Sequence, residues 1–346
     1  LKTMMITTMK TMMILALVTL GLTAVNASTY YVPADYPSIK EAVDASTHGD
    51  IIIVADGTWS GPNNRNIDMS YKDIQVMSAN GPELCTIDVG NSYFGFKMTT
   101  GKIEGFTIKN ATQSGQGFGV YFSSGGGRVN NCVLEDNNAG LYGEYCSGVD
   151  VVNCIVQDNE QGGLYCINSE IDIFNSQLSS PDDEPVHGRS LSIVNVYNCL
   201  IMGNAMSYQE SIMNLANCTI IGDVEMYEYA EAHLTNSIVW GGGLSYGASA
   251  YYTVTYCNTE TLYPGEGNIS SDPMFVAGPG GAYYLGQVAA GQASDSPCVD
   301  AGADDADVTC YQAGSDQFCM GDFITRTDEE LDTGTVDMGY HYPEIG

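Results

Sequence analysis

The sequence predicts an all-β fold, a single-stranded parallel β-helix, from two features of the 346-residue chain. The first is a pair, Asn or Tyr followed by Cys or Ser, that recurs seven times at spacings of 19 to 23 residues. A fixed period of this length is typical of a solenoid, in which each repeat buries its apolar edge against its neighbours. The second is the period-two alternation of apolar residues after each pair, which indicates strands. The pairs are Asn131-Cys132, Asn153-Cys154, Asn175-Ser176, Asn198-Cys199, Asn217-Cys218, Asn236-Ser237 and Tyr256-Cys257.

Each pair has a predicted place in the coil. The small Cys or Ser should point inward and stack on its counterpart in the next turn, about 4.8 Å away. The residue before it should occupy a corner, where an asparagine amide can bond to the asparagines above and below. No helical stripe of apolar residues lies between the repeats, so helical crossovers are not expected.

A second register supports the coil. It consists of three Gly-x-Tyr triplets, in which the middle residue is predicted to be buried and the tyrosine to point outward. The triplets are Gly119-Val120-Tyr121, Gly140-Leu141-Tyr142 and Gly163-Leu164-Tyr165.

The ends of the chain depart from the repeat, as the capping segments of a solenoid should. The first residues combine two lysines, an apolar run and the small-residue sequence Val25-Asn26-Ala27, the pattern of a signal peptide, so a secreted protein is expected. An amphipathic stretch follows, and a Gly-, Asp- and Pro-rich region ends the chain. We therefore expect a signal peptide, an N-terminal cap, coils and a closing region at residues 1–27, 28–49, 50–261 and 262–346, the last three forming one domain, 28–346.

Four stretches carry a family resemblance. VPADYPSIKEAVDASTHGDIIIVADGTW, which begins at Val32, resembles the opening segment of secreted right-handed parallel β-helix proteins of the pectin lyase-like superfamily. SDPMFV, SPCVDAG and TRTDEELDTGTVDMGYHYP resemble the closing segment of bacterial members. The resemblance implies a right-handed coil. It implies no single activity, because the superfamily includes lyases, hydrolases, esterases, epimerases and adhesins.

The charge of the chain limits its partners. Eleven Lys and Arg stand against 42 Asp and Glu, a formal net charge of −31. Such a field repels nucleic acids and anionic lipids, so neither is expected as a partner. It also slows the approach of polyuronates and suits a protein that binds divalent cations. No stretch after residue 27 is long enough and apolar enough to span a membrane.

An acidic ladder is the candidate metal site. Counted from the small residue of each repeat, Asp136 and Asp158 fall four residues later, and Glu160 and Asp182 fall six residues later. Carboxylates on successive turns repel one another unless they are bridged, and Ca²⁺ takes several oxygen ligands. These four residues are therefore predicted to hold Ca²⁺, and the alternative is a solvated acidic turn.

The loop PDDEPVHGRS supplies the catalytic candidates, because it interrupts the alternation and gathers Asp182, Asp183, His187 and Arg189. Paired carboxylates near a histidine can do acid–base chemistry. Polygalacturonases of the same superfamily carry a paired Asp and a His-Gly on neighbouring turns, whereas here Asp183 and His187 are four residues apart on one loop. The alternative is a polar surface loop.

A fainter resemblance is to pectin methylesterases, whose two acids would match Gln209-Glu210 and Glu225. Both acids are Glu here. No basic residue between Arg189 and Arg326 replaces the catalytic arginine of that family.

The outward column Tyr121, Tyr142 and Tyr165 is the candidate binding site. Aromatic rings offer apolar faces on which sugar rings can lie, with hydroxyls for orientation. The alternative is a ladder that only stabilises the coil.

The 11 cysteines divide into two groups. Those of the repeat are predicted to be small core residues, and the spacing of zinc ligands is absent. Cys310 and Cys319 lie in a polar region outside the repeat and are the pair predicted to form a disulfide.

The prediction for function is non-catalytic binding of extracellular polysaccharide or cell-surface glycan, with Ca²⁺ as the candidate cofactor. The alternative is a polysaccharide-active enzyme: a lyase, a glycoside hydrolase or a pectinesterase-like enzyme. A cleft with perturbed acids would favour the enzyme, and a face with exposed tyrosines would favour binding.

Overall fold

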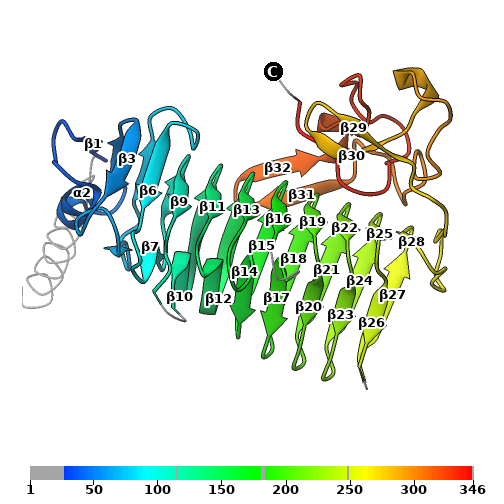
Figure 1. Cartoon of the computed structure of the whole chain (residues 1–346), viewed down its shortest axis with the longest axis horizontal. Coiled ribbons are helices and arrows are strands. Elements are labelled where there is room, and N and C mark those ends of the chain that lie inside the picture. Colours follow the sequence, from blue (N-terminus) through cyan, green and yellow to red (C-terminus); the bar gives the residue numbers. More distant parts are fainter. Residues whose placement is uncertain (1–26, 114–115, 181–183, 248, 345–346) are drawn as a thin grey trace, which may run out of the picture.

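The computed structural model describes residues 27–113, 116–180, 184–247 and 249–344, and its strands coil into a parallel β-helix (Figure 1). Three ladders of parallel strands form its faces. One hydrophobic cluster fills the coil from end to end. The parallel β-helix predicted from the repeat is therefore confirmed.

Ladder 1 follows the long turns of the coil. Its strands pair in parallel, for example Leu141 with Leu164 and Leu164 with Val186. Two long strands, β10 and β12, contribute their first halves to this ladder and their second halves to ladder 2, which joins the two ladders into one sheet. The strands of ladder 1 are β4 (Ile67–Asp68), β7 (Phe94–Met98), β10 (Phe118–Asn130), β12 (Ala139–Val152), β14 (Leu164–Ile167), β17 (Val186–Arg189), β20 (Ala205–Ser207), β23 (Val224–Met226) and β26 (Leu244–Tyr246).

Ladder 2 comes next along each turn and ends at the Asn corner. Besides the second halves of β10 and β12, its strands are β1 (Thr29–Val32), β2 (Ile51–Val54), β5 (Gln75–Ser78), β8 (Lys102–Glu104), β15 (Glu170–Phe174), β18 (Ile193–Tyr197), β21 (Ile212–Ala216), β24 (Glu231–Thr235) and β27 (Tyr251–Thr255).

Ladder 3 begins just after the corner and has ten strands. They are β3 (Gly57–Ser60), β6 (Cys85–Asp88), β9 (Thr107–Lys109), β11 (Val133–Glu135), β13 (Ile155–Gln157), β16 (Gln177–Ser179), β19 (Leu200–Met202), β22 (Thr219–Ile221), β25 (Ile238–Trp240) and β28 (Asn258–Thr259).

The corner residue of every repeat has a left-handed backbone, with φ between 48° and 53° in all seven. Asparagine adopts this conformation more readily than other residues with a Cβ, which explains its place before the small residue. The predicted amide ladder forms in part, since Asn198 Nδ2 donates to Asn175 Oδ1 at 3.0 Å. Asn131 and Asn153, by contrast, are exposed. The common requirement at the corner is therefore conformational.

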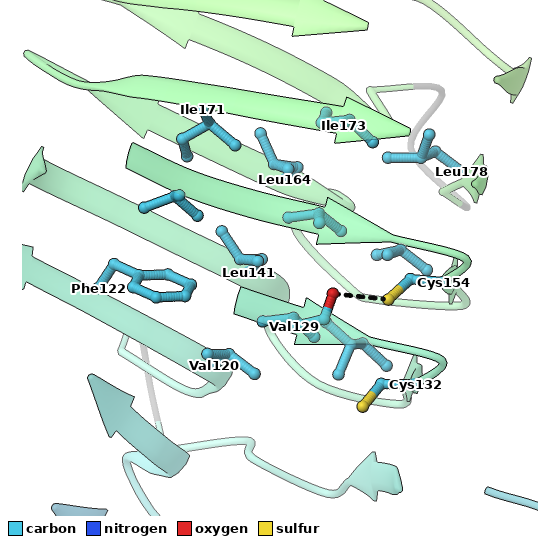
Figure 2. Close-up of a cluster of buried hydrophobic side chains, with 14 of the residues drawn as sticks. Val120, Phe122, Val129, Cys132, Leu141, Cys154, Leu164, Ile171, Ile173 and Leu178 are labelled. Atoms are coloured by element: carbon cyan, nitrogen blue, oxygen red, sulfur yellow. Dashed lines mark hydrogen bonds between the residues drawn. The ribbon is translucent and has the colours of Figure 1, made fainter. Parts of the chain in front are cut away.

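The inward column of Cys and Ser is buried, as predicted. Its side chains also replace backbone hydrogen bonds at the corner. Ser176 Oγ donates to the Phe174 carbonyl at 2.8 Å and accepts the N–H of Cys154, one turn earlier, at 3.0 Å. Ser237 repeats the arrangement with the N–H of Cys218 at 3.1 Å. Figure 2 shows Cys132 and Cys154 in this column beside Val120, Leu141 and Leu164, which stack inside the coil as predicted.

The N-terminal turns are covered by the helix α2 (Ile39–Ala45). Ser38 caps it by accepting the N–H of Glu41, and Ile39, Ala42 and Val43 are buried against the first coils. The amphipathic stretch expected to cap the coil is thus helical where it meets β1, β2 and β4.

Residues near Tyr256 form backbone hydrogen bonds with the segment that follows the last turn of the coil. The C-terminal region then folds back beside the later turns (Figure 1). Asn198 holds it through two bonds to the backbone of His341, 2.7 and 2.9 Å long, and Asn236 Oδ1 accepts the N–H of Ala303 at 2.9 Å. A disulfide joins Cys310 to Cys319. The elements here are β29 (Phe275–Gly278), β30 (Gly281–Leu285), η1 (Val288–Ala290), β31 (Cys310–Ala313), β32 (Asp316–Cys319) and η2 (Met320–Asp322).

No helix within the described ranges has the length and hydropathy that a membrane span requires.

Candidate functional site

The column Tyr121, Tyr142 and Tyr165 lies on the outer face of ladder 1, on the neighbouring strands β10, β12 and β14. All three rings are partly exposed. Lys97 precedes Tyr121 in the same register, and its Nζ lies 5.7 Å from the centre of that ring. His187 follows Tyr165. The tyrosines therefore occupy one continuous outward column, next to the core residues expected from the triplets.

The rings do not form a uniform stack. Tyr121 and Tyr142 are 5.8 Å apart and tilted by 53°, whereas Tyr142 lies nearly parallel to Phe118, with 4.5 Å between centroids and 13° between planes. Phe94 adds a tilted ring 6.4 Å from Tyr121. Tilted neighbours leave parts of the ring faces uncovered, so this arrangement can contact a flat apolar ligand.

The aromatic side chains line a groove of about 330 Å³. Its floor comes from ladder 1, and the turns that lead into the ladder add polar walls. The lining residues are Tyr93, Phe94, Gln116, Phe118, Tyr121, Ala139, Tyr142, Glu144, Gln161 and Tyr165.

Phe94 and Phe118 were not among the residues predicted for the site. A signal for them exists, because each directly precedes a glycine in the register of the triplets, as Ala139 precedes Gly140. The polar residue Gln116 comes from a turn of irregular length, which no period predicts.

Glu144 is the carboxylate that lines the groove, and its Oε2 accepts from the Tyr121 hydroxyl at 3.4 Å. Burial raises the pKa of Tyr121 and of Tyr142, and the Glu144 charge adds to both shifts. Both hydroxyls are therefore protonated at neutral pH and can donate hydrogen bonds. A second acid, which general acid–base hydrolysis requires, is missing from the lining of the groove in the described part of the chain.

His187 continues the aromatic column, stacked between Tyr165 at 4.8 Å and Tyr208 at 5.3 Å. Burial, with a smaller contribution from Arg189, lowers the pKa of His187 to about 4, so the imidazole is neutral at pH 7. Its Nδ1 lies 3.6 Å from the Glu184 carboxylate. Among the catalytic candidates, Asp182 and Asp183 lie outside the described residues, and Arg189 Nε bonds to Gln209 Oε1 at 3.3 Å.

The structure places Asp136 and Asp158 at equivalent exposed turn positions, each with a φ of 53°, and Glu160 is exposed nearby in sequence. Asp182 lies outside the described residues. Within the ranges that the structure covers, no three His, Cys, Asp or Glu side chains are grouped so that they could hold a metal ion. Calcium binding stays a prediction.

The two acids matched to pectin methylesterases lie in different columns. Glu210 is exposed at the corner between ladders 1 and 2. Glu225 belongs to β23, where Asn204 and the Tyr227 hydroxyl bond to its carboxylate at 3.0 and 2.8 Å.

A polar column on ladder 2 was also missed, although a signal for it was present: each member stands three residues before a corner residue. The column runs from Arg128 through Asp150, Asp172, Asn195 and Asn214. The amide of Asn195 donates to Asp172 at 2.6 Å. Burial raises the pKa of Asp150 and of Asp172, and each charge lies one turn from the other.

The hairpin of β31 and β32 covers one end of this polar column. Arg128 forms an ion pair with Asp316 and donates to the Ala313 carbonyl at 3.3 Å. Val152, Phe174 and Ala313 form a small hydrophobic cluster beneath the hairpin.

Comparison with known proteins shows what this architecture is similar to. The crystal structure of a pectate lyase, Pel9A, is 14% identical, with a TM-score of 0.51 over 90% of this chain and 96% of that chain. A pectin methylesterase from Aspergillus niger, in deglycosylated form, is 16% identical, with a TM-score of 0.38 over 73% of this chain and 88% of that chain. No protein-family model and no curated protein matches the sequence. At such identities the likeness concerns the fold alone, and the protein has a right-handed parallel β-helix fold like that of the pectate lyase.

Proposed function

We propose that this protein acts outside the cell and binds a neutral or weakly charged glycan, as polysaccharide or on a cell surface, in the groove on ladder 1. The observation that carries the proposal is the groove itself, whose lining contains Tyr121, Tyr142 and Tyr165 together. Its volume, about 330 Å³, falls within the range of ordinary ligand pockets.

The chemistry of the lining suits sugar rings. The apolar faces of a pyranose pack against aromatic rings, and its hydroxyls need donors and acceptors around the edge. The tyrosine hydroxyls donate, Glu144 accepts, and the amides of Gln116 and Gln161 do both. The net charge of −31 disfavours a polyanionic ligand.

The orientation of the ligand follows from the coil. Equivalent tyrosines rise by about 4.8 Å per turn, which matches a sugar chain that runs along the coil axis with one ring spanning about one turn. Tyr142 is the central member, between Tyr121 and Tyr165 in the register, and its ring also contacts that of Phe118. Its removal should weaken binding more than removal of Tyr121.

A panel of immobilised polysaccharides tests the proposal, with retention and released products measured in the same samples. Tyr142→Ala should lose most of the retention, Tyr121→Ala should lose less, and Tyr71→Ala should behave as wild type because Tyr71 is exposed and does not line the groove. Unchanged retention in a folded Tyr142→Ala variant would show that the column is structural.

The alternative function, a polysaccharide-active enzyme, is favoured by one observation. Asp150 and Asp172 form a pair of half-buried acids with raised pKa beside Arg128, a pattern found at catalytic sites. The same panel tests it: an enzyme of this kind releases products, and Asp150→Asn abolishes the release without changing retention.

A further inference from the structure

A second cavity, of about 490 Å³, opens where ladder 1 turns into ladder 2 near the C-terminal end of the coil. Three of its lining residues are unusually exposed for apolar side chains: Leu191 at 65%, Tyr229 at 63% and Tyr251 at 63%. Two carboxylates, Glu210 and Glu231, line it with them. The groove on ladder 1 shares none of these residues.

The coil arranges these side chains in two parallel columns. Ile212, Glu231 and Tyr251 occupy one register on three successive strands of ladder 2. Leu191, Glu210 and Tyr229 repeat the order apolar, acidic, aromatic at the corner, one turn earlier. The cavity thus has aliphatic side chains at one end, tyrosines at the other and the two carboxylates between them.

The backbone conformation at the corner between ladders 1 and 2 disfavours large side chains, so the presence of Leu191, Glu210 and Tyr229 there needs a reason. Leu191, Glu210 and Tyr229 have φ values of 62°, 60° and 68°, a left-handed conformation that bulky side chains adopt only with strain. At the corner between ladders 2 and 3, by contrast, asparagine fills the left-handed position in six of the seven repeats. Large exposed residues at the corner between ladders 1 and 2 serve no packing purpose in the coil.

We infer that this cavity binds a small organic cation with an alkylated ammonium group. Tyrosine faces attract such cations, whose methyl groups also pack on apolar side chains, and the two carboxylates supply the opposite charge. Arg189 lies two residues before Leu191 and bonds through its Nε to Gln209, and no other lysine or arginine occurs before Arg326, so the charge around the cavity is mainly negative. His233 is the nearby histidine, with Nε2 3.8 Å from the Glu231 carboxylate.

A metal ion, or an alkylated ammonium group that belongs to a lipid, fits this cavity less well. A hydrated metal ion gains nothing from tyrosine and aliphatic walls, and the cavity offers two carboxylates where a metal needs more ligands. A lipid headgroup would bring a phosphate against Glu210 and Glu231, which repel it. The proposed ligand is therefore a free, soluble molecule.

Choline and its uncharged isostere 3,3-dimethylbutan-1-ol, which have nearly the same shape, test the inference. Ligand-observed NMR titrations at pH 8 should show millimolar binding of choline and none of the isostere. Tyr229→Ala should raise the Kd about threefold, Tyr229→Phe should keep wild-type affinity, and Glu231→Gln should weaken binding by a similar factor. Tyr246→Ala is the matched control, since Tyr246 is equally exposed at 66% but lies outside the cavity.

The outcome is separable from that of the glycan proposal, because Tyr142→Ala should bind choline like the wild type. Equal binding of the isostere, wild-type affinity in both Tyr229→Ala and Glu231→Gln, or binding to phosphatidylcholine vesicles in place of free choline would overturn the inference. The substituted side chains are exposed or half-buried, and a thermal melt of each variant verifies that it is folded.

Discussion

The inward column allows a sharp test of how the coil is held together at its corner. Ser176 is fully buried, and its hydroxyl joins two turns by donating to the Phe174 carbonyl and accepting the Cys154 N–H. In Ser176→Ala both bonds disappear. The Phe174 carbonyl keeps a partner, because the N–H of Asn153 also donates to it at 3.1 Å. The Cys154 N–H is left buried without one.

The expected loss of folding free energy follows from the unsatisfied Cys154 N–H alone. An unsatisfied buried donor costs about 1–3 kcal/mol, and removal of one hydroxyl leaves little cavity. Ser176→Cys should lose less than about 1 kcal/mol, because Cys199 already serves at the same place and accepts the N–H of Ser176 at 3.4 Å. The variant with the larger side chain is therefore predicted to be the more stable of the two.

Urea denaturation measures the global effect, and amide hydrogen exchange at Cys154 measures the local one. Because turns of a solenoid can open separately, the exchange rate is the more direct readout. Ser176→Ala should speed exchange of the Cys154 amide about tenfold or more, while Ser176→Cys leaves it near the wild-type rate. Equal exchange in the two variants would refute the role assigned to the hydroxyl.

Three further predictions concern packing, pH and salt. Cys154→Leu should overpack the buried column and lower the free energy of unfolding by about 1–3 kcal/mol, whereas Cys154→Ser should be milder; equal losses in denaturant titrations would contradict this. The pKa of His187 is lowered to about 4 in the folded protein, whereas the histidine of the unfolded chain has a pKa of about 6.5. Between these two pH values the unfolded chain therefore binds a proton that the folded protein does not bind. Stability should therefore fall across that window, by up to about 3 kcal/mol, and His187→Phe should reduce the loss; urea titrations at pH 7 and pH 4.5 compare them. Millimolar Ca²⁺ should raise the melting temperature more than Na⁺ at equal ionic strength if Asp136 and Asp158 share an ion, and equal melting temperatures would indicate general screening alone.

The coil could be predicted from the sequence because its determinants are local and repeated. A left-handed corner residue followed by a small inward side chain recurs in seven turns, and the same spacing places Tyr121, Tyr142 and Tyr165 in one column. Amide bonding, the role predicted for the corner asparagines, is only part of their role, because the left-handed backbone is the feature that all seven corners share. Both demands select the same residue, so the incomplete explanation did not change the register.

The groove and the C-terminal region depend on sequence features that do not repeat with the period of the coil. The groove needs Gln116 from a turn whose length differs from those of its neighbours, and the C-terminal region is held by contacts such as that between Asn198 and His341, which are 143 residues apart. Neither the irregular turn nor the long-range contact can be recognised from a short window of sequence. The polar column of Arg128, Asp150 and Asp172 was periodic and could have been found by applying the corner spacing to polar residues.

The two cavities proposed as sites share a physical origin. A perfectly repeated turn gives flat ladders, because each side chain is covered by an equivalent neighbour about 4.8 Å away. Phe94 and Phe118 break the uniformity of ladder 1, and the rings beside them tilt and leave room for a ligand. At the corner between ladders 1 and 2, Leu191 and Tyr229 are large exposed side chains, and the surface is again hollowed. The inward columns must stay constant to keep the coil, so ligand binding can develop only in the outward positions, and there it follows the interruptions of the repeat.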